Sequence, residues 1–310
     1  MHPKHLVVVV ALVACGDPDE TIQVETGELI GRVEVSADVP AGDCLVVLEG
    51  SPLGARCDGA GAFDIVGVLP GRWDLRVVAD ASTALPSRRV AAAANPGFVT
   101  DLGAVRLAQP GAIGGRVVGV TDGVIVVPAF GIVTAPNDNG GYLLEGVPPG
   151  VHEVVLISGT QSVSRNGITV LPGKPTIAID LDAGAGIEVA TEVSGTALRA
   201  NRGAGGHGGL TIELIDAATG AVAIATQTAA DGAFTLPTGP GIFAVRARDG
   251  ESPITAVIPS VVPHGNLPLV LPSPLVVFPL GDLDRDGLDD QPSLEHALPR
   301  MRARLVEPDR

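Results

Sequence analysis

The sequence of 310 residues predicts an all-β protein made of three tandem domains. The first observation behind this prediction is a stretch that occurs three times, at 58–77, 137–156 and 230–247. Each copy holds a Gly-rich turn, one aromatic residue, a short apolar run, a Pro-Gly pair and alternating apolar residues. The second observation is the content of 41 Gly and 26 Pro, which favours short strands joined by tight turns over helices.

Each copy of the repeat predicts a turn, a strand, a second turn and a second strand. In the first copy, alternation with period two places Trp73, Leu75 and Val77 on one face of the second strand, and Asp74 and Arg76 on the other. The Pro-Gly pair reverses the chain without strain, because Pro presets one turn dihedral and Gly tolerates a positive φ. A period of about 80 to 90 residues is the size of a domain and too long for a solenoid repeat. The aromatic residues of the three copies are Phe63, Tyr142 and Phe234.

The predicted domains span 27–108, 109–184 and 185–280, and each opens with a Gly followed by alternating apolar residues, at Gly31, Gly115 and Gly195. A leader at 1–14 and an acidic tether at 15–26 precede them. A segment at 281–310 follows, with an acidic loop and a basic tail.

The leader has a positive start and nine apolar residues from Leu6 to Ala14. A membrane-spanning helix needs about 20 apolar residues, so this stretch predicts a signal peptide. The quartet LVAC resembles the bacterial lipobox, which implies cleavage before Cys15 and lipid attachment to it. In that family, Gly16 after the cysteine implies sorting to the outer membrane. The alternative is an ordinary signal peptide in which Cys15 is incidental.

Cys44 and Cys57 are the other two cysteines. A two-residue turn at Gly50-Ser51 would set them directly opposite each other across a hairpin, and export would place them in an oxidising compartment. We therefore predict a disulfide, worth about 3 kcal/mol in the chain-entropy model. Two buried free thiols are the alternative.

The order of an opening Gly-x-Val strand, a hairpin, a D-G-x-F turn and a P-G strand resembles the carboxypeptidase regulatory-like domain, over about 250 residues in three copies. This resemblance implies seven-stranded Greek-key sandwiches of the prealbumin-like (transthyretin-like) class, used as rigid non-catalytic modules and often grouped with carbohydrate-binding-like folds. The middle copy departs by having His152 where the others have Trp73 and Phe243.

The stretch DLDRDGLDD at 282–290 places carboxylates at alternate positions before a glycine, the pattern that wraps a hard cation. It is similar to the calcium loops of thrombospondin type 3 and dockerin repeats, and Ser293 stands where an EF-hand has its last ligand. A single loop of this kind predicts calcium binding on the order of 10⁻⁴ M or weaker. A solvated acidic turn is the alternative. The predicted ligands are Asp282, Asp284, Asp286, Leu288, Asp290 and Glu295.

The net charge of −15 and the absence of a basic stripe argue against a nucleic-acid partner. The sequence also predicts no enzyme. The glycines at 203, 205 and 208 match a dinucleotide-binding motif, but the LTIELID strand follows where that fold needs a helix. The histidines are scattered, without the H-E-x-x-H spacing of a metal-binding helix.

The sequence therefore predicts a lipid-anchored envelope protein, periplasmic or on the cell surface, whose sandwiches form a stalk or adhesion scaffold with polysaccharide or an envelope protein as the partner. A carbohydrate-binding protein is the first alternative, but Trp73 and Tyr142 occupy positions that face a core. An accessory subunit of an envelope enzyme or transport system is the second.

Overall fold

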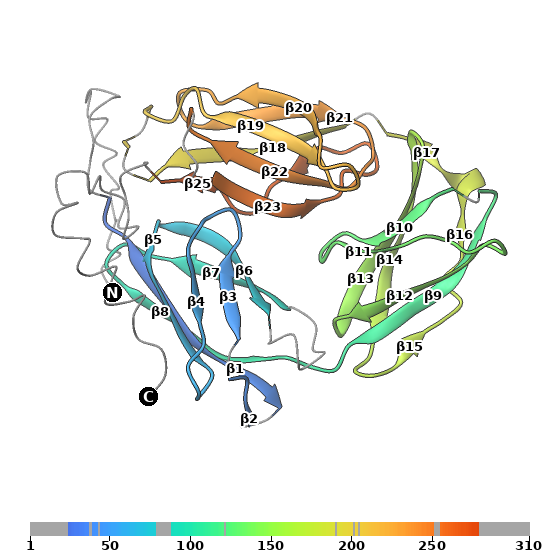
Figure 1. Cartoon of the computed structure of the whole chain (residues 1–310), viewed down its shortest axis with the longest axis horizontal. Helices are drawn as coiled ribbons and strands as arrows, with labels where there is room; N and C mark the ends of the chain where they lie inside the picture. Colours follow the sequence, from blue (N-terminus) through green and yellow to red (C-terminus); the bar gives the residue numbers. More distant parts are fainter. Residues whose placement is uncertain are drawn as a thin grey trace, which may run out of the picture.

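The computed structural model describes residues 24–278, except 37–38, 43, 79–87, 121, 190, 201, 204 and 251–254. Over these residues the protein consists of β-strands and loops, with a single 3-10 turn, η2 (Ala183–Ala185). The strands form three sandwiches of two sheets each, which follow one another along the chain (Figure 1). The prediction of an all-β, three-sandwich protein is confirmed.

In the first sandwich, β1 lies between β5 and β8 and also pairs with the short β2. The second sheet has the order β4-β3-β6-β7. Strands β1 and β8 run parallel, and the other pairs are antiparallel. The strands are β1 (Gly27–Ser36), β2 (Val39–Pro40), β3 (Leu45–Leu48), β4 (Gly54–Arg56), β5 (Ala62–Val68), β6 (Gly71–Val78), β7 (Arg88–Ala94) and β8 (Val99–Arg106).

The second sandwich repeats this plan, with β9 between β12 and a final strand that is broken into β15 and β16. Its other sheet has the order β11-β10-β13-β14-β17. Because β17 pairs with β14, this unit extends past the expected boundary at 184. The strands are β9 (Gly111–Val118), β10 (Val124–Val127), β11 (Ile132–Thr134), β12 (Gly141–Val147), β13 (Gly150–Ser158), β14 (Gln161–Val170), β15 (Pro175–Thr176), β16 (Leu181–Asp182) and β17 (Ile187–Glu188).

The third sandwich places β18 between β21 and a final strand divided into β24 and β25. Its other sheet has the order β20-β19-β22-β23. In all three units the opening strand is therefore antiparallel to the strand that carries the aromatic residue and parallel to the last strand. The strands are β18 (Thr191–Arg199), β19 (Thr211–Asp216), β20 (Val222–Gln227), β21 (Ala233–Thr238), β22 (Phe243–Arg248), β23 (Thr255–Val261), β24 (Leu269–Val270) and β25 (Leu275–Val277).

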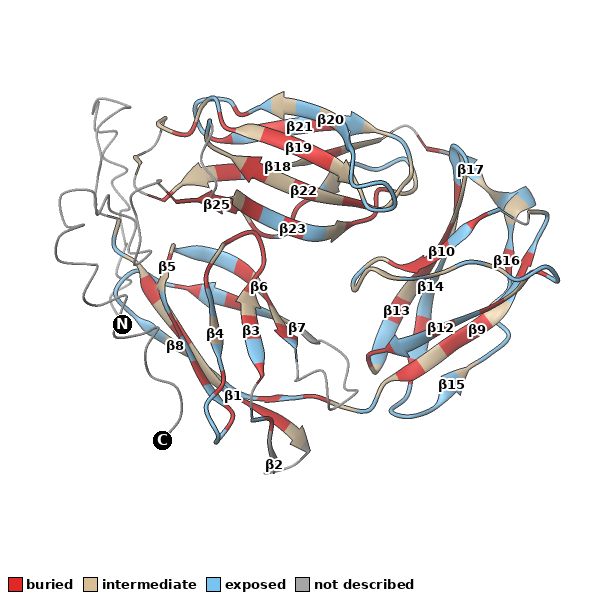
Figure 2. Cartoon of the chain, in the orientation of Figure 1, coloured by how far each residue is buried: buried red, intermediate tan, exposed pale blue. Residues whose placement is uncertain are grey.

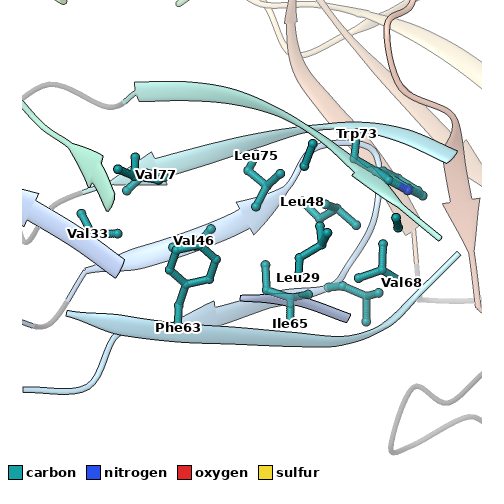
Figure 3. Close-up of a cluster of buried hydrophobic side chains, with 14 of the residues drawn as sticks. Leu29, Val33, Val46, Leu48, Phe63, Ile65, Val68, Trp73, Leu75 and Val77 are labelled. Carbon is teal, nitrogen blue, oxygen red and sulfur yellow. The ribbon is translucent and has the colours of Figure 1, made fainter. Parts of the chain in front are cut away.

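Each sandwich buries its own apolar cluster between its two sheets. The alternation predicted for β6 is confirmed, since Trp73, Leu75 and Val77 are buried while Asp74 and Arg76 are only partly covered. Figure 3 shows these three side chains packed with Leu48 and Phe63 in the first core. In Figure 2 the buried positions run along the inward faces of the strands.

The sandwiches do not stand end to end as a straight stalk. In Figure 1 the third sandwich lies over the first, and the second lies beside them. Two side chains from the end of the third segment, Val276 and Phe278, belong to the buried cluster of the first sandwich, together with Ala200. The chain thus folds back on itself after the second sandwich.

Candidate functional site

The three repeats share one cross-strand pair, a glycine of the opening strand opposite the aromatic residue. The pairs are Gly31 with Phe63, Gly115 with Tyr142, and Gly195 with Phe234. At the first, a Cβ on residue 31 would lie 2.7 Å from a ring atom of Phe63, and at the third, a Cβ on residue 195 would lie 3.1 Å from a ring atom of Phe234. The repeated glycine is thus a packing requirement of the fold.

The turns that precede the aromatic strands of the first two copies are also built in the same way. The Oδ1 atom of Asp58 accepts hydrogen bonds from the backbone N–H groups of Ala60 and Ala62, both at 2.8 Å. Asn137 makes the equivalent bonds in the second copy. In the first copy Gly61 holds the left-handed position with a φ of 77°. Asp58 and Asn137 therefore have a structural explanation as side chains that close a loop.

His152 takes over the hydrogen bond that Trp73 makes in the first repeat. Trp73 Nε1 donates to the carbonyl oxygen of Leu69 at 2.9 Å, and His152 Nε2 lies 2.6 Å from the carbonyl oxygen of Pro148. Both donors reach back four residues across the Pro-Gly turn. Because a carbonyl can only accept, His152 carries its proton on Nε2 here. The histidine of the middle copy is thus buried at the position that a tryptophan occupies in the first copy.

Cys44 and Cys57 are joined by a disulfide, with their Cα atoms 5.0 Å apart. The Cys57 N–H also donates to the Cys44 carbonyl oxygen at 2.8 Å, which places the two residues opposite each other at the end of the β3-β4 hairpin. Both cysteines are buried, and the disulfide is part of the apolar cluster of the first sandwich.

The first seam, between the first and third sandwiches, centres on the tip of the β3-β4 hairpin. The Asp74 N–H donates to Ser273 Oγ at 2.9 Å, and the Val276 N–H donates to the Gly50 carbonyl oxygen at 2.7 Å. A Cβ on residue 50 would meet the carbonyl oxygen of Pro274, and Gly50 has a φ of 81°. The chain approaches so closely here that only glycine fits.

Charged side chains flank the first seam. Glu49, which is 4% exposed, forms ion pairs with Arg76 at 2.8 Å and with Arg89 at 2.9 Å. The pKa of the neighbouring Asp74 is raised, mainly by burial. The positive charge of Arg89 acts to lower this pKa, and the negative charge of Glu49 acts to raise it. Two arginines thus neutralise the acidic groups that the seam covers, which offsets the free-energy cost of burying them.

The second seam joins the outer face of the β10-β13-β14 sheet to the third sandwich. Val126 and Val155 pack against Val262 in a small buried cluster, with Ile157 and Ile242 at its edge. This seam is apolar at its centre.

Polar contacts surround the apolar centre of the second seam. The Gly265 N–H donates to Ser162 Oγ at 3.2 Å, and His264 Nε2 lies 3.1 Å from Glu153 Oε1. This ion pair could not be found from the sequence, because the two residues lie far apart in the chain and neither belongs to a motif.

Two open grooves of about 580 and 600 Å³ lie at equivalent places in the second and first sandwiches. Each is lined by the arginine of the opening strand, Arg116 or Arg32, which donates to a turn carbonyl, that of Asn139 or Ala60. Among the described residues, no cluster of three or more His, Cys, Asp or Glu side chains is arranged to hold a metal ion.

The glycine-rich loop at 203–209 is held by Arg199. Its guanidinium makes two hydrogen bonds to Asp249, at 2.7 and 2.9 Å, and donates to the carbonyl oxygens of Gly206 and Gly208. His207 Nδ1 accepts from the Arg199 N–H, and burial, followed by Arg199, lowers the pKa of His207. Strand β19 follows the loop, so the loop supports a strand and not a phosphate-binding helix.

Other predicted residues lie outside the described part of the chain. They are Cys15 and the calcium-loop ligands Asp282, Asp284, Asp286, Leu288, Asp290 and Glu295. Within the described part, no helix is long and apolar enough to cross a membrane.

No protein-family model matches the chain, and a search of curated proteins finds no match either. Similar solved structures include the Bacillus anthracis TIE protein, at 11% identity and a TM-score of 0.24, with 82% of this chain and 51% of that chain covered. The chain therefore spans about half the length of that protein.

Two pilins are also among the similar structures. A minor pilin of Streptococcus agalactiae aligns at 8% identity and a TM-score of 0.27, over 50% of this chain and 94% of its own. The major pilin subunit of Bacillus cereus aligns at 9% identity and a TM-score of 0.22, over 81% and 99%. Similarity at this level carries no argument about activity or partners.

Proposed function

We propose that this chain is a non-catalytic, lipid-anchored protein of the cell envelope that acts as a surface scaffold or adhesion module. The observation that supports this most strongly is the pair of seams, which hold three sandwiches in one arrangement through buried apolar contacts and cross-domain hydrogen bonds. Polar groups of the repeats close turns, hold a loop and support the seams.

The lipid anchor rests on Cys15 and the apolar leader before it. Expression of the full chain in a diderm bacterium with an alkyne fatty acid tests this, followed by membrane fractionation. We expect labelling of the chain and its loss in Cys15→Ala, with release of the protein from the outer membrane. A variant with both Cys44→Ala and Cys57→Ala keeps Cys15 and serves as the control. Equal labelling of Cys15→Ala and the unsubstituted chain would refute the anchor.

A carbohydrate-binding role is the weaker alternative. Sugar sites stack their ligand on exposed aromatic rings, but Trp73 is 2% exposed and Tyr142 is 7% exposed. Phe98 is the one aromatic side chain among the exposed large apolar residues of the described chain, at 69%. A glycan array with the chain from Gly16 onward, run with calcium and with chelator, separates the two functions, since calcium-dependent binding would favour the carbohydrate role.

The acidic stretch at 282–290 is proposed to bind calcium weakly. Titration calorimetry of the chain from Gly16 onward should give a dissociation constant on the order of 10⁻⁴ M or weaker. Asp284→Asn and Asp286→Asn should each weaken it, while Asp64→Asn on β5 should have no effect. If Asp284→Asn and Asp286→Asn both bind calcium as tightly as the unsubstituted chain, the predicted loop is not the calcium site.

A further inference from the structure

His264 stands at the second seam with an acceptor at each ring nitrogen. Nε2 lies 3.1 Å from Glu153 Oε1 on β13, and Nδ1 lies 2.7 Å from the carbonyl oxygen of Val262. A neutral imidazole has one N–H and can donate to only one of them, whereas the protonated ring donates to both. The geometry around His264 is therefore complete only when the ring is charged.

The position of this group makes its charge state matter for the whole molecule. His264 lies two residues after Val262, which is buried against Val126 and Val155 of the second sandwich. The neighbouring Gly265 N–H reaches Ser162 Oγ on β14. In the sequence, His264 thus lies between Val262, at the apolar centre of the seam, and Gly265, which makes the cross-domain hydrogen bond to Ser162.

We propose that protonation of His264 closes the second sandwich onto the third, with His264, Glu153 and the Val262 carbonyl acting together as a proton-dependent latch. The protonated ring ties the carboxylate of one sandwich to the backbone of the other. Loss of the proton removes one of these two bonds and the attraction to Glu153, which loosens the seam. The proposal goes beyond the scaffold function, because it makes the relative position of two modules depend on external pH.

The groups that face the latch are consistent with this behaviour. The hydrogen bond to Glu153 is the main cause that raises the pKa of His264, with burial acting against it and the Val262 carbonyl adding to it. The same bond to His264 is the main cause that lowers the pKa of Glu153, with burial opposing it, and the neutral Ser164 and Asn166 side chains on β14 also stabilise its carboxylate. Glu153 is the one charged side chain that acts on His264 in these contacts.

The pH range in which the latch is closed follows from the raised pKa of His264 and the lowered pKa of Glu153. The raised pKa of His264 means that its contribution is fully present below the ordinary histidine pKa of about 6.5 and is lost as the pH rises through the raised value. The lowered pKa of Glu153 means that its contribution is present above the ordinary value of about 4.3 and is lost as the pH falls through the lowered one. The latch is therefore closed in mildly acidic solution and opens toward alkaline pH.

The test is a distance measurement between the two sandwiches at pH 6 and at an alkaline pH, since the latch opens as the pH rises through the raised pKa of His264. Spin labels at Leu143→Cys on β12 and Val222→Cys on β20, both 47% exposed, report this distance in a chain that also carries Cys15→Ser. Hydrogen exchange in the segment 262–265, corrected for the intrinsic rate, reports the seam directly. We expect one short distance at pH 6, and a longer distance with faster exchange at the higher pH, because the contribution of the protonated ring to closure is lost as the pH rises through the raised pKa of His264.

The variants Glu153→Gln and His264→Gln should remove this pH dependence. Glu145→Gln, an equally conservative change at an exposed position of β12, should keep it and serves as the matched control. Equal distances and exchange rates at the two pH values in the unsubstituted chain would overturn the proposal. So would full pH dependence in both seam variants. If circular dichroism shows that a variant is unfolded, the proposal is judged from the pH dependence of the distance and of hydrogen exchange in the unsubstituted chain alone.

Discussion

Gly31 lies directly opposite Phe63 in the antiparallel pair of β1 and β5, and ring atoms of Phe63 fill the space that a side chain on residue 31 would need. The same pairing recurs in the other two sandwiches. The glycine and the aromatic residue that recur in the sequence are therefore paired across two neighbouring strands in each sandwich.

The glycine of the second copy should tolerate substitution least. A Cβ on residue 115 would lie 2.0 Å from the carbonyl oxygen of Ile179, which is backbone and cannot rotate away, whereas at Gly31 the nearest obstacle is the Phe63 ring. We expect Gly115→Ala to destabilise its sandwich by about 1–3 kcal/mol and by more than Gly31→Ala. Denaturant unfolding followed by circular dichroism measures this. Gly59→Ala, where a Cβ meets nothing within 4 Å, is the control, and equal midpoints for all three variants would contradict the prediction.

Replacement of His152 by phenylalanine tests the shared hydrogen bond across the Pro-Gly turn. Phe243 occupies the corresponding position of the third copy, so a phenyl ring is acceptable in this type of core. The lost bond to the Pro148 carbonyl should still cost about 1 kcal/mol. Thermal unfolding of His152→Phe and of Trp73→Phe should therefore show a loss at both positions. An increased midpoint for His152→Phe would mean that the hydrogen bond contributes less than the added apolar surface.

The Cys44–Cys57 bridge should matter mainly for the first sandwich. Its removal in a Cys44→Ala, Cys57→Ala chain should cost about 3 kcal/mol, because the bridge restricts the unfolded chain. Denaturant unfolding with and without reductant gives the measurement. The reductant should lower the unfolding midpoint of the unsubstituted chain and leave that of the double variant unchanged. An equal shift in both would mean that the reductant does not act through the Cys44–Cys57 bridge.

Ser273→Ala should open the first seam. The Ser273 side chain is buried and accepts the N–H of Asp74, so its removal leaves a donor without that partner, at a cost of about 1–3 kcal/mol. Hydrogen exchange at the Asp74 amide is the direct measurement. Ser158→Ala, which removes an exposed hydroxyl contact to Asp122, should leave that amide protected.

The sequence predicted the parts of the fold that depend on neighbours along the chain. The centre of the β3-β4 hairpin lies between Gly50 and Ser51 as predicted, since Leu45 pairs with Arg56. The connection between the strands is nevertheless wider than two residues, because β3 ends at Leu48 and β4 begins at Gly54. Pro52 has no N–H with which to extend the ladder. Period-two alternation and turn chemistry are local, which explains why they could be recognised.

The seams could not be predicted from local pattern. Asp74 and Ser273 are 199 positions apart, and their hydrogen bond depends on how whole sandwiches meet. His264 has no unusual neighbours in the sequence, and its significance comes from Glu153 on another domain. The predicted boundary at 184 places β17 in the third domain, whereas the structure pairs it with β14 of the second sandwich.

The packing of Val276 and Phe278 into the first sandwich determines where the described chain ends. The described chain starts in the first sandwich and finishes against it, so both ends of the described chain belong to the same module. The second sandwich carries neither end of the described chain, so the fold closes on itself between its first and third modules.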